Sequence, residues 1–109
     1  MTERLPKVNE LLRKEVGAAL KSEISTDAVV TVTRAEVSRT MEHATVWVSV
    51  FPEDKAEEVL NKIKADIYQI QQIINKRLFM RIVPKIRFEI DKSMEKVTKV
   101  EEVLEKTQK

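Results

Sequence analysis

The chain has 109 residues, of which 42% are hydrophobic and 35% are charged, and its formal net charge is +2. This length predicts one domain over residues 1–109, and the composition allows a real core beneath a well-solvated surface. The lack of cysteine excludes disulfides, thiolate zinc sites and thiol catalysis. A single glycine, Gly17, excludes glycine-rich loops that bind phosphate through backbone N–H groups, so side chains must make most contacts with any phosphate.

The sequence also gives an expectation for location. Its apolar runs fall well short of the roughly 20 residues that span a bilayer. The first residues, MTERLPKVNE, lack the apolar core of a signal peptide. We therefore expect a soluble cytoplasmic protein with no membrane partner.

The first predicted element is a helix over residues 5–24, whose apolar residues recur at helical spacing. Pro6 lies in the first turn, where its missing N–H costs little. The polar face carries cations interrupted by acids, so a solvated face and an extension of a binding surface both remain open. Its charged residues are Arg4, Lys7, Glu10, Arg13, Lys14, Glu15 and Lys21.

Two strands follow and predict a β-hairpin. The segment 29–38 is rich in β-branched residues, and its apolar alternation changes parity near Arg34, which indicates a bulge. The segment 44–50 alternates cleanly, with Trp47 on its less apolar face. Burial of Trp47 under a terminal helix is favoured over an exposed stacking platform, and both remain open.

A long helix of about 25 residues is predicted to begin near Pro52, because its apolar residues form one continuous stripe. Pro84 marks the start of a third strand, in which Ile86, Phe88 and Ile90 alternate with charged residues. A weaker fourth helix is predicted over 93–109. The order α-β-β-α-β predicts an α+β fold in which helices cover one face of a three-stranded mixed sheet.

The segment NKRLFMRIVPKIRF, residues 75–88, carries five positive charges and no acid. Cations complement the dipole at a helix C-terminus, but here the charge continues onto the third strand. We expect these cations to share one outward surface. Taken alone, the run is as compatible with a solvated face as with nucleic-acid binding. The five cations are Lys76, Arg77, Arg81, Lys85 and Arg87.

Two ordered segments resemble the bacterial ribosome-binding factor A family, and the resemblance extends over nearly the whole chain. VTRAEVSRTMEHATVWVSVF is similar to the family's hairpin. RLFMRIVPKIRFEIDKS is similar to its last-strand motif, with Arg81, Pro84, Phe88 and Asp91 on the pattern. The resemblance implies a type II KH-like domain without catalytic activity, cofactor or metal. It also implies a monomer that acts on the free or immature 30S small ribosomal subunit and assists 16S rRNA maturation.

The resemblance favours rRNA phosphate as the partner of the basic run. Arg77 and Arg81 are the preferred contacts, because a guanidinium can bind phosphate through two parallel hydrogen bonds. The alternative is a protein-interaction module that recruits another assembly factor through the hairpin's outer face or the terminal helix. The full set of predicted RNA-binding residues is Lys7, Arg13, Lys14, Arg39, Tyr68, Lys76, Arg77, Arg81, Lys85 and Arg87.

One departure from the family lies in the long helix. Counted back from Arg81-Ile-Val-Pro, the family's Ala-x-Gly interruption falls on Asp66-Ile67-Tyr68, so that tyrosine replaces glycine. Tyrosine disfavours the φ values that glycine permits. Either the helix kinks there through a different backbone conformation, or it runs straighter. Tyr68 also offers a ring that could stack on a base.

The other candidates are predicted to be structural. His43 is the single histidine and has no partner residues for a metal site or for general-base catalysis. Phe79, Met80 and Met94 are expected to pack against the core.

Overall fold

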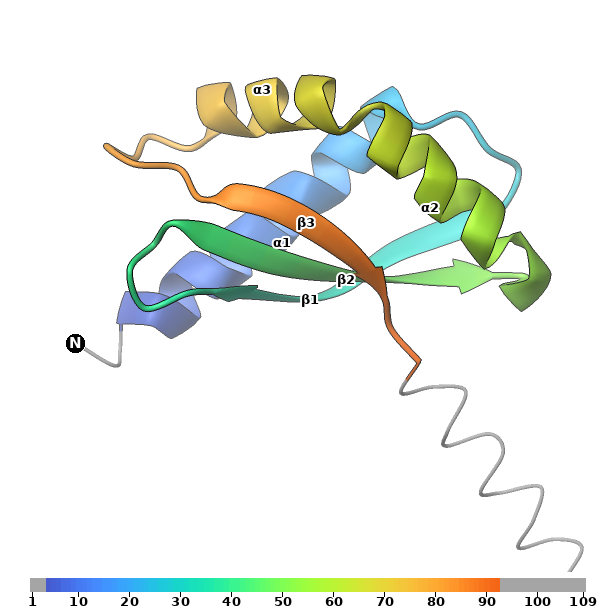
Figure 1. Cartoon of the computed structure of the whole chain (residues 1–109), viewed down its shortest axis with the longest axis horizontal. Helices are drawn as coiled ribbons and strands as arrows, with labels where there is room; N and C mark the ends of the chain where they lie inside the picture. Colours follow the sequence, from blue (N-terminus) through green and yellow to red (C-terminus); the bar gives the residue numbers. More distant parts are fainter. Residues whose placement is uncertain (1–3, 93–109) are drawn as a thin grey trace, which may run out of the picture.

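The computed structural model describes residues 4–92, so the helix predicted over 93–109 lies outside the described residues. No helix within the described part is long and apolar enough to cross a membrane. The elements in chain order are α1 (Arg4–Glu23), β1 (Val29–Val37), β2 (His43–Phe51), the 3-10 helix η1 (Glu53–Lys55), α2 (Ala56–Ala65), α3 (Ile67–Arg77) and β3 (Lys85–Ile90) (Figure 1).

The sheet has β2 in its centre, antiparallel to β1 and parallel to β3. A parallel pair needs a crossover connection, and α2 and α3 supply it. In all three strands buried residues alternate with more exposed ones, so that one face of the sheet packs against helices and, among residues 4–92, no element covers the other, open face. This confirms the predicted α+β fold, with its three-stranded mixed sheet covered on one face and its type II KH-like order.

The predicted bulge in β1 is present. The pairing register shifts between Val32, which lies opposite Val48, and Arg34, which lies opposite Trp47. The extra residue keeps Val32 and Ala35 buried, although their spacing differs from the simple alternation of a strand.

The core lies between the helices and the covered face of the sheet, and the predicted apolar stripes supply it. Ile86 and Phe88 are buried as predicted, and Ile90 is half-buried. Within the described part, no charged or polar side chain belongs to the buried class. Nine core residues have no exposed surface at all: Leu12, Val16, Ala19, Val46, Val48, Val59, Ile63, Ile70 and Ile74.

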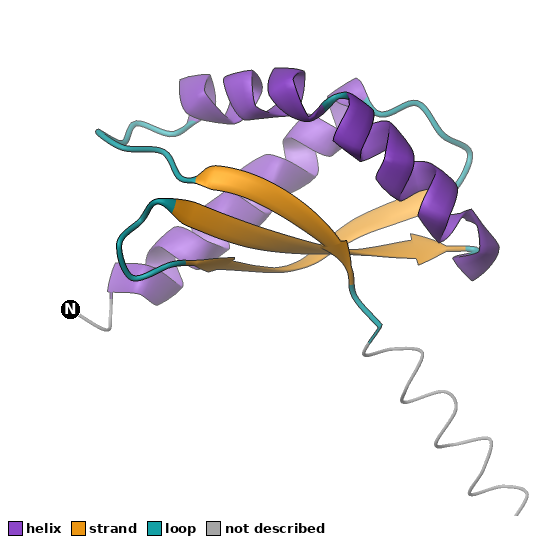
Figure 2. Cartoon of the chain, in the orientation of Figure 1, coloured by secondary structure: helices purple, strands orange, loops and turns teal. Residues whose placement is uncertain are grey.

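The long helix is split at Asp66 rather than straight, and Figure 2 shows a bend between its two segments. Asp66 has φ −105° and ψ 15°, so the break needs no glycine conformation. Its N–H still donates to the carbonyls of Lys62 and Ile63 (both 3.1 Å), and its carbonyl accepts from the Ile70 N–H (3.0 Å). The axis therefore bends without loss of these hydrogen bonds, and Tyr68 takes the place of the family's glycine with its side chain exposed.

Removal of side-chain volume from the α2 stripe should destabilise the fold. Ile63 is completely buried, so Ile63→Ala should lower the free energy of unfolding by about 2–5 kcal/mol in urea titrations. The neighbouring Asn61 is exposed, and Asn61→Ala should change it by less than about 0.5 kcal/mol. Equal losses in the two variants would contradict the assignment of Ile63 to the core.

The end of α1 meets the helix break through two acidic side chains. A hydrogen bond with Asp66 raises the pKa of Glu23 above its usual value of 4.5. Because the folded-state pKa is the higher one, the pair stabilises the fold most at acid pH, and this contribution is lost as pH rises through the pKa of the folded carboxyl. Above that range the two carboxylates repel each other.

Glu23→Gln should therefore raise the free energy of unfolding at neutral pH, and the gain should disappear below about pH 4. Urea titrations over a pH series measure this difference. Glu42→Gln removes an exposed carboxylate of the β1–β2 loop and serves as the charge-matched control, with no gain expected. A gain that persisted unchanged into acid would show that carboxylate repulsion is not its cause.

Candidate nucleic-acid interface

Two loops come together at one end of the domain, where the chain leaves α3 and enters β3 (Figure 1). The Lys85 N–H donates to the Glu42 carbonyl (2.9 Å), which joins the start of β3 to the β1–β2 loop. The Asn9 Oδ1 atom accepts from the Val37 N–H (2.9 Å), so the first turns of α1 lie beside the end of β1. We define the basic end as the five exposed cations gathered there: Arg39, Lys76, Arg77, Arg81 and Lys85.

The basic end is only partly neutralised by acids of the same chain. The Arg77 Nη1 atom lies 3.2 Å from Glu15 Oε2, so this guanidinium is already engaged. The other four cations form no ion pair among residues 4–92. Glu42, in the β1–β2 loop, is the acid that the Lys85 contact brings to this end. Four cations from separate segments are thus available to an anion.

The expected single surface over residues 75–88 is not what the structure shows. Lys76 and Arg77 belong to the helical layer, whereas Arg87 lies on the open face of the sheet, because its neighbours Ile86 and Phe88 are buried. The Arg87 Nε–H donates to Thr45 Oγ1 (3.2 Å). Its Nη2 atom lies 3.6 Å from Glu89 Oε1. The strand alternation therefore places Arg87, like Lys85, on the open face and away from the helical cations, and its contacts hold Arg87 among its own neighbours. Lys85 still belongs to the basic end, because it begins β3 and its N–H donates to the Glu42 carbonyl.

The cations of α1 differ in their availability. The Arg13 Nε–H donates to Glu10 Oε2 (3.0 Å), and a second hydrogen bond joins the same two groups. These bonds raise the pKa of Arg13 and lower that of Glu10. Lys7 and Lys14 are exposed and form no ion pair in the described part of the chain. Arg13 is therefore a weaker candidate for phosphate than the two lysines.

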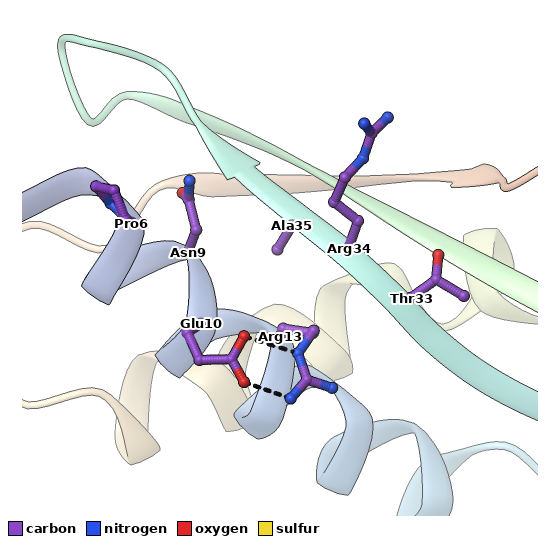
Figure 3. Close-up of a pocket in the computed structure, with 7 residues that line it drawn as sticks. All are labelled: Pro6, Asn9, Glu10, Arg13, Thr33, Arg34 and Ala35. Atoms are coloured by element: carbon purple, nitrogen blue, oxygen red, sulfur yellow. Dashed lines mark hydrogen bonds and ion pairs between the residues drawn. The ribbon is translucent and has the colours of Figure 1, made fainter. Parts of the chain in front are cut away.

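The Glu10–Arg13 pair lines a shallow pocket of about 310 Å³ between α1 and β1. Figure 3 shows the two side chains facing each other, with Arg34 directed away from them. Arg34 also belongs to the lining, and its Nη1 atom lies 3.8 Å from Glu36 Oε1. Both cations of the pocket therefore already have an acidic partner, and neither is free to attract an anion. The remaining lining residues are Pro6, Asn9, Thr33 and Ala35.

Trp47 is half-buried on the open face of the sheet. The Arg34 guanidinium carbon lies 3.9 Å from the centre of its ring, a cation–π contact across the bulge. The ring is therefore neither a core residue nor a free stacking platform within the described part. The terminal helix that was expected to cover it lies outside the described residues.

The aromatic and methionine candidates differ in exposure and in position. Tyr68 is 69% exposed, but it lies at the start of α3, about 14 Å along the helix axis from Arg77 and outside the basic end. Phe79 was predicted to pack, and this is wrong, since its side chain is 100% exposed. Leu78, the first residue after α3, is buried, and the chain then turns outward at Phe79. Met80 packs partly against the core as predicted, and Met94 lies outside the described residues.

One structural residue of the site was missed by sequence reasoning. The Gln71 carboxamide accepts from the Ile86 N–H (2.9 Å) and donates to the Pro84 carbonyl (3.1 Å). It thus pairs with the free edge of β3 as another strand would, and anchors the loop 78–84 to α3. A glutamine on the polar side of a helix carries no sequence signal of such a role.

Asp91, which belongs to the family's last-strand motif, has a structural role. The Thr33 Oγ1–H donates to Asp91 Oδ2 (2.6 Å), and the Asp91 N–H donates to the Val48 carbonyl (2.7 Å). Asp91 therefore ties the end of β3 to the bulge in β1.

Comparisons with known proteins agree with the sequence resemblance. Residues 4–104 match the family model described as Ribosome-binding factor A. A Clostridium botulinum (strain Loch Maree / Type A3) protein of that name is 32% identical over 105 residues, which cover 93% of this chain and 88% of the relative. A Flavobacterium psychrophilum protein of that name is 32% identical over 109 residues, which cover 94% and 84% respectively.

Solved structures share the fold. The crystal structure of ribosome-binding factor A from Thermus thermophilus has a TM-score of 0.71 at 17% identity, and covers 81% of this chain and 96% of its own. A homology model of the Thermus thermophilus factor, fitted into a cryo-EM map of its 30S complex, has a TM-score of 0.65 at 17% identity, with coverages of 77% and 91%. A Thermotoga maritima protein studied by solution NMR gives 0.68 at 27% identity, with coverages of 83% and 89%.

Loss of the Gln71 carboxamide should loosen the anchor of the loop 78–84. Gln71→Ala leaves the Ile86 N–H and the Pro84 carbonyl without their partner, so the free energy of unfolding should fall by about 1–3 kcal/mol. Amide hydrogen exchange at Ile86 should accelerate as well. Gln69 is exposed on the same helix, and Gln69→Ala should alter neither quantity. Unchanged exchange at Ile86 in Gln71→Ala would contradict this role.

Proposed function

The chain belongs to the ribosome-binding factor A family, and on that premise we propose that it binds the free or immature 30S small ribosomal subunit, assisting 16S rRNA processing and subunit assembly. It does so as a non-catalytic, cytoplasmic monomer whose 109 residues form a single KH-like RNA-binding domain. The observation that carries this proposal is the basic end, where four cations without ion-pair partners in the described part come from separate segments. A face that is only solvated gives no reason for cations from separate segments to lie together. The phosphates of an RNA backbone give one, because their negative charges neutralise these cations.

The contacts of this surface are expected to be made by side chains. Phosphate contacts set the position of a protein on RNA, and the shape of the RNA supplies most of the selectivity. The separate origins of the cations suit this mode, because a loop, a helix end and a strand start together match one arrangement of the backbone. A factor that only binds can promote maturation by binding one rRNA conformation better than another.

The ion pair of Arg77 changes which arginines are the best candidates for phosphate contacts. Arg77 and Arg81 were preferred from the sequence, but the Arg77 guanidinium is held by Glu15. Arg39 and Arg81 are both exposed and have no ion-pair partner among residues 4–92. We therefore assign the main phosphate contacts to Arg39 and Arg81, with Lys76 and Lys85 beside them. Lys7 and Lys14 extend the surface along α1, and Arg77 contributes after release from Glu15.

Sedimentation with purified small subunits at two salt concentrations tests this assignment. The unaltered chain should bind free small subunits in preference to whole ribosomes, and log K should fall with log salt at a slope of roughly −4 for about five phosphates. The double variant Arg39→Ala/Arg81→Ala should bind about tenfold or more weakly, and its salt slope should be smaller in magnitude by about 2.

The matched control removes two cations from elsewhere. Lys21→Ala/Lys64→Ala also changes the formal net charge from +2 to 0, but both lysines lie outside the basic end. If the two double variants lost affinity equally, overall charge rather than this surface would govern binding. Binding that survived nuclease treatment and high salt would instead favour the protein-interaction alternative.

A further inference from the structure

The loop 78–84 exposes apolar side chains at the basic end. Phe79 is 100% exposed and Ile82 is 61% exposed, although both belong to a run whose neighbours Leu78 and Pro84 are buried. A fully exposed phenylalanine loses the free energy that burial of its ring would provide, so a partner that covers it gains that free energy. Phe79 is therefore a candidate contact rather than part of the core.

The surroundings of Phe79 indicate the chemistry of that partner. The chain has no acidic residue from 67 to 88, whereas Lys76, Arg77 and Arg81 all lie within three positions of Phe79. Of these cations, only Arg77 is engaged by a carboxylate in the described part. An apolar protein surface or a neutral lipid surface has no need of these charges. A single-stranded nucleic acid offers both an anionic backbone and flat bases.

We propose that Phe79 stacks on an unpaired nucleobase of single-stranded RNA, while Arg81 and Lys76 bind phosphates that flank that base. This rests on the proposed function and deepens it, because it assigns a single-stranded segment to the α3–β3 loop. Stacking on an aromatic ring tolerates any base, so the contact selects for unpaired structure rather than for sequence.

The loop geometry is consistent with this role. The Gln71 hydrogen bonds to Pro84 and Ile86 hold the C-terminal end of the loop. The Leu78 N–H donates to the Ile74 carbonyl (2.9 Å) and holds the N-terminal end. Between these anchors Phe79 projects into solvent, where both faces of its ring are accessible. A base in a duplex is already stacked, so this contact is open only to unpaired RNA.

The test compares variants of the full chain for binding to a fluorescein-labelled oligouridylate, which has no secondary structure, and to a short RNA duplex. Phe79→Ala and Phe79→Leu should each weaken oligouridylate binding by roughly 5- to 150-fold, the range measured for loss of one stacked base. Phe79→Tyr keeps the ring and should retain the affinity. Duplex binding and the salt slope should be unchanged in all three, because no phosphate contact is lost.

Two comparisons separate stacking from apolar contact. Leucine preserves an apolar side chain without a π-face, so unchanged binding of Phe79→Leu would overturn the proposal in favour of a plain hydrophobic contact. Ile82→Ala truncates a second exposed apolar residue of the same loop and should bind the oligouridylate normally. Because Phe79 is fully exposed, none of its variants should lose stability, and unfolding curves verify this.

The outcomes also separate this inference from the proposed function. If every Phe79 variant binds oligouridylate as the unaltered chain does, while Arg39 and Arg81 still govern binding to small subunits, nucleobase stacking is overturned and the proposed function stands. If the unaltered chain shows no salt-dependent affinity for small subunits, the proposed function is wrong and this inference falls with it.

Discussion

Burial of one face of the central strand is the constraint on which the rest of this structure depends. Val46 and Val48 have no exposed surface, and β2 pairs with both other strands. Because β3 runs parallel to β2, the chain must return through α2 and α3 to the end where β2 begins. The loop after α3 is thereby brought beside the β1–β2 loop. Four cations of the basic end come from the local run 75–88, and the topology adds Arg39 of the β1–β2 loop to them.

The periodic parts of this structure were predictable from the sequence, and the long-range contacts were not. Apolar spacing predicted the helices and strands, and the change of parity in β1 predicted its bulge, because both depend on neighbouring residues. The Arg77–Glu15 pair joins residues that are 62 positions apart, so the sequence alone left Arg77 among the best phosphate candidates. Phe79 was assigned to the core because an apolar residue after a helical stripe looks the same whether the chain turns inward or outward.

The split helix shows how a feature of the family can persist without its usual residue. The resemblance places glycine at position 68, where this chain has tyrosine, but the break lies at Asp66 and uses a negative φ. Both segments thereby keep their stripes in the core, since Val59 and Ile63 of α2 and Ile70 and Ile74 of α3 are completely buried. Packing of α2 on β2 and β3 and of α3 on α1, rather than the freedom of a glycine, maintains the bend.

The Gln71 carboxamide has a consequence for affinity as well as for the sheet edge. A loop that must be ordered when its ligand arrives loses conformational entropy at that moment and binds more weakly for it. Here α3 and β3 hold the loop at both ends before any ligand is present, so most of that ordering has been completed during folding. The tip is preorganised, and its few exposed side chains can give more affinity than their small contact area alone would suggest.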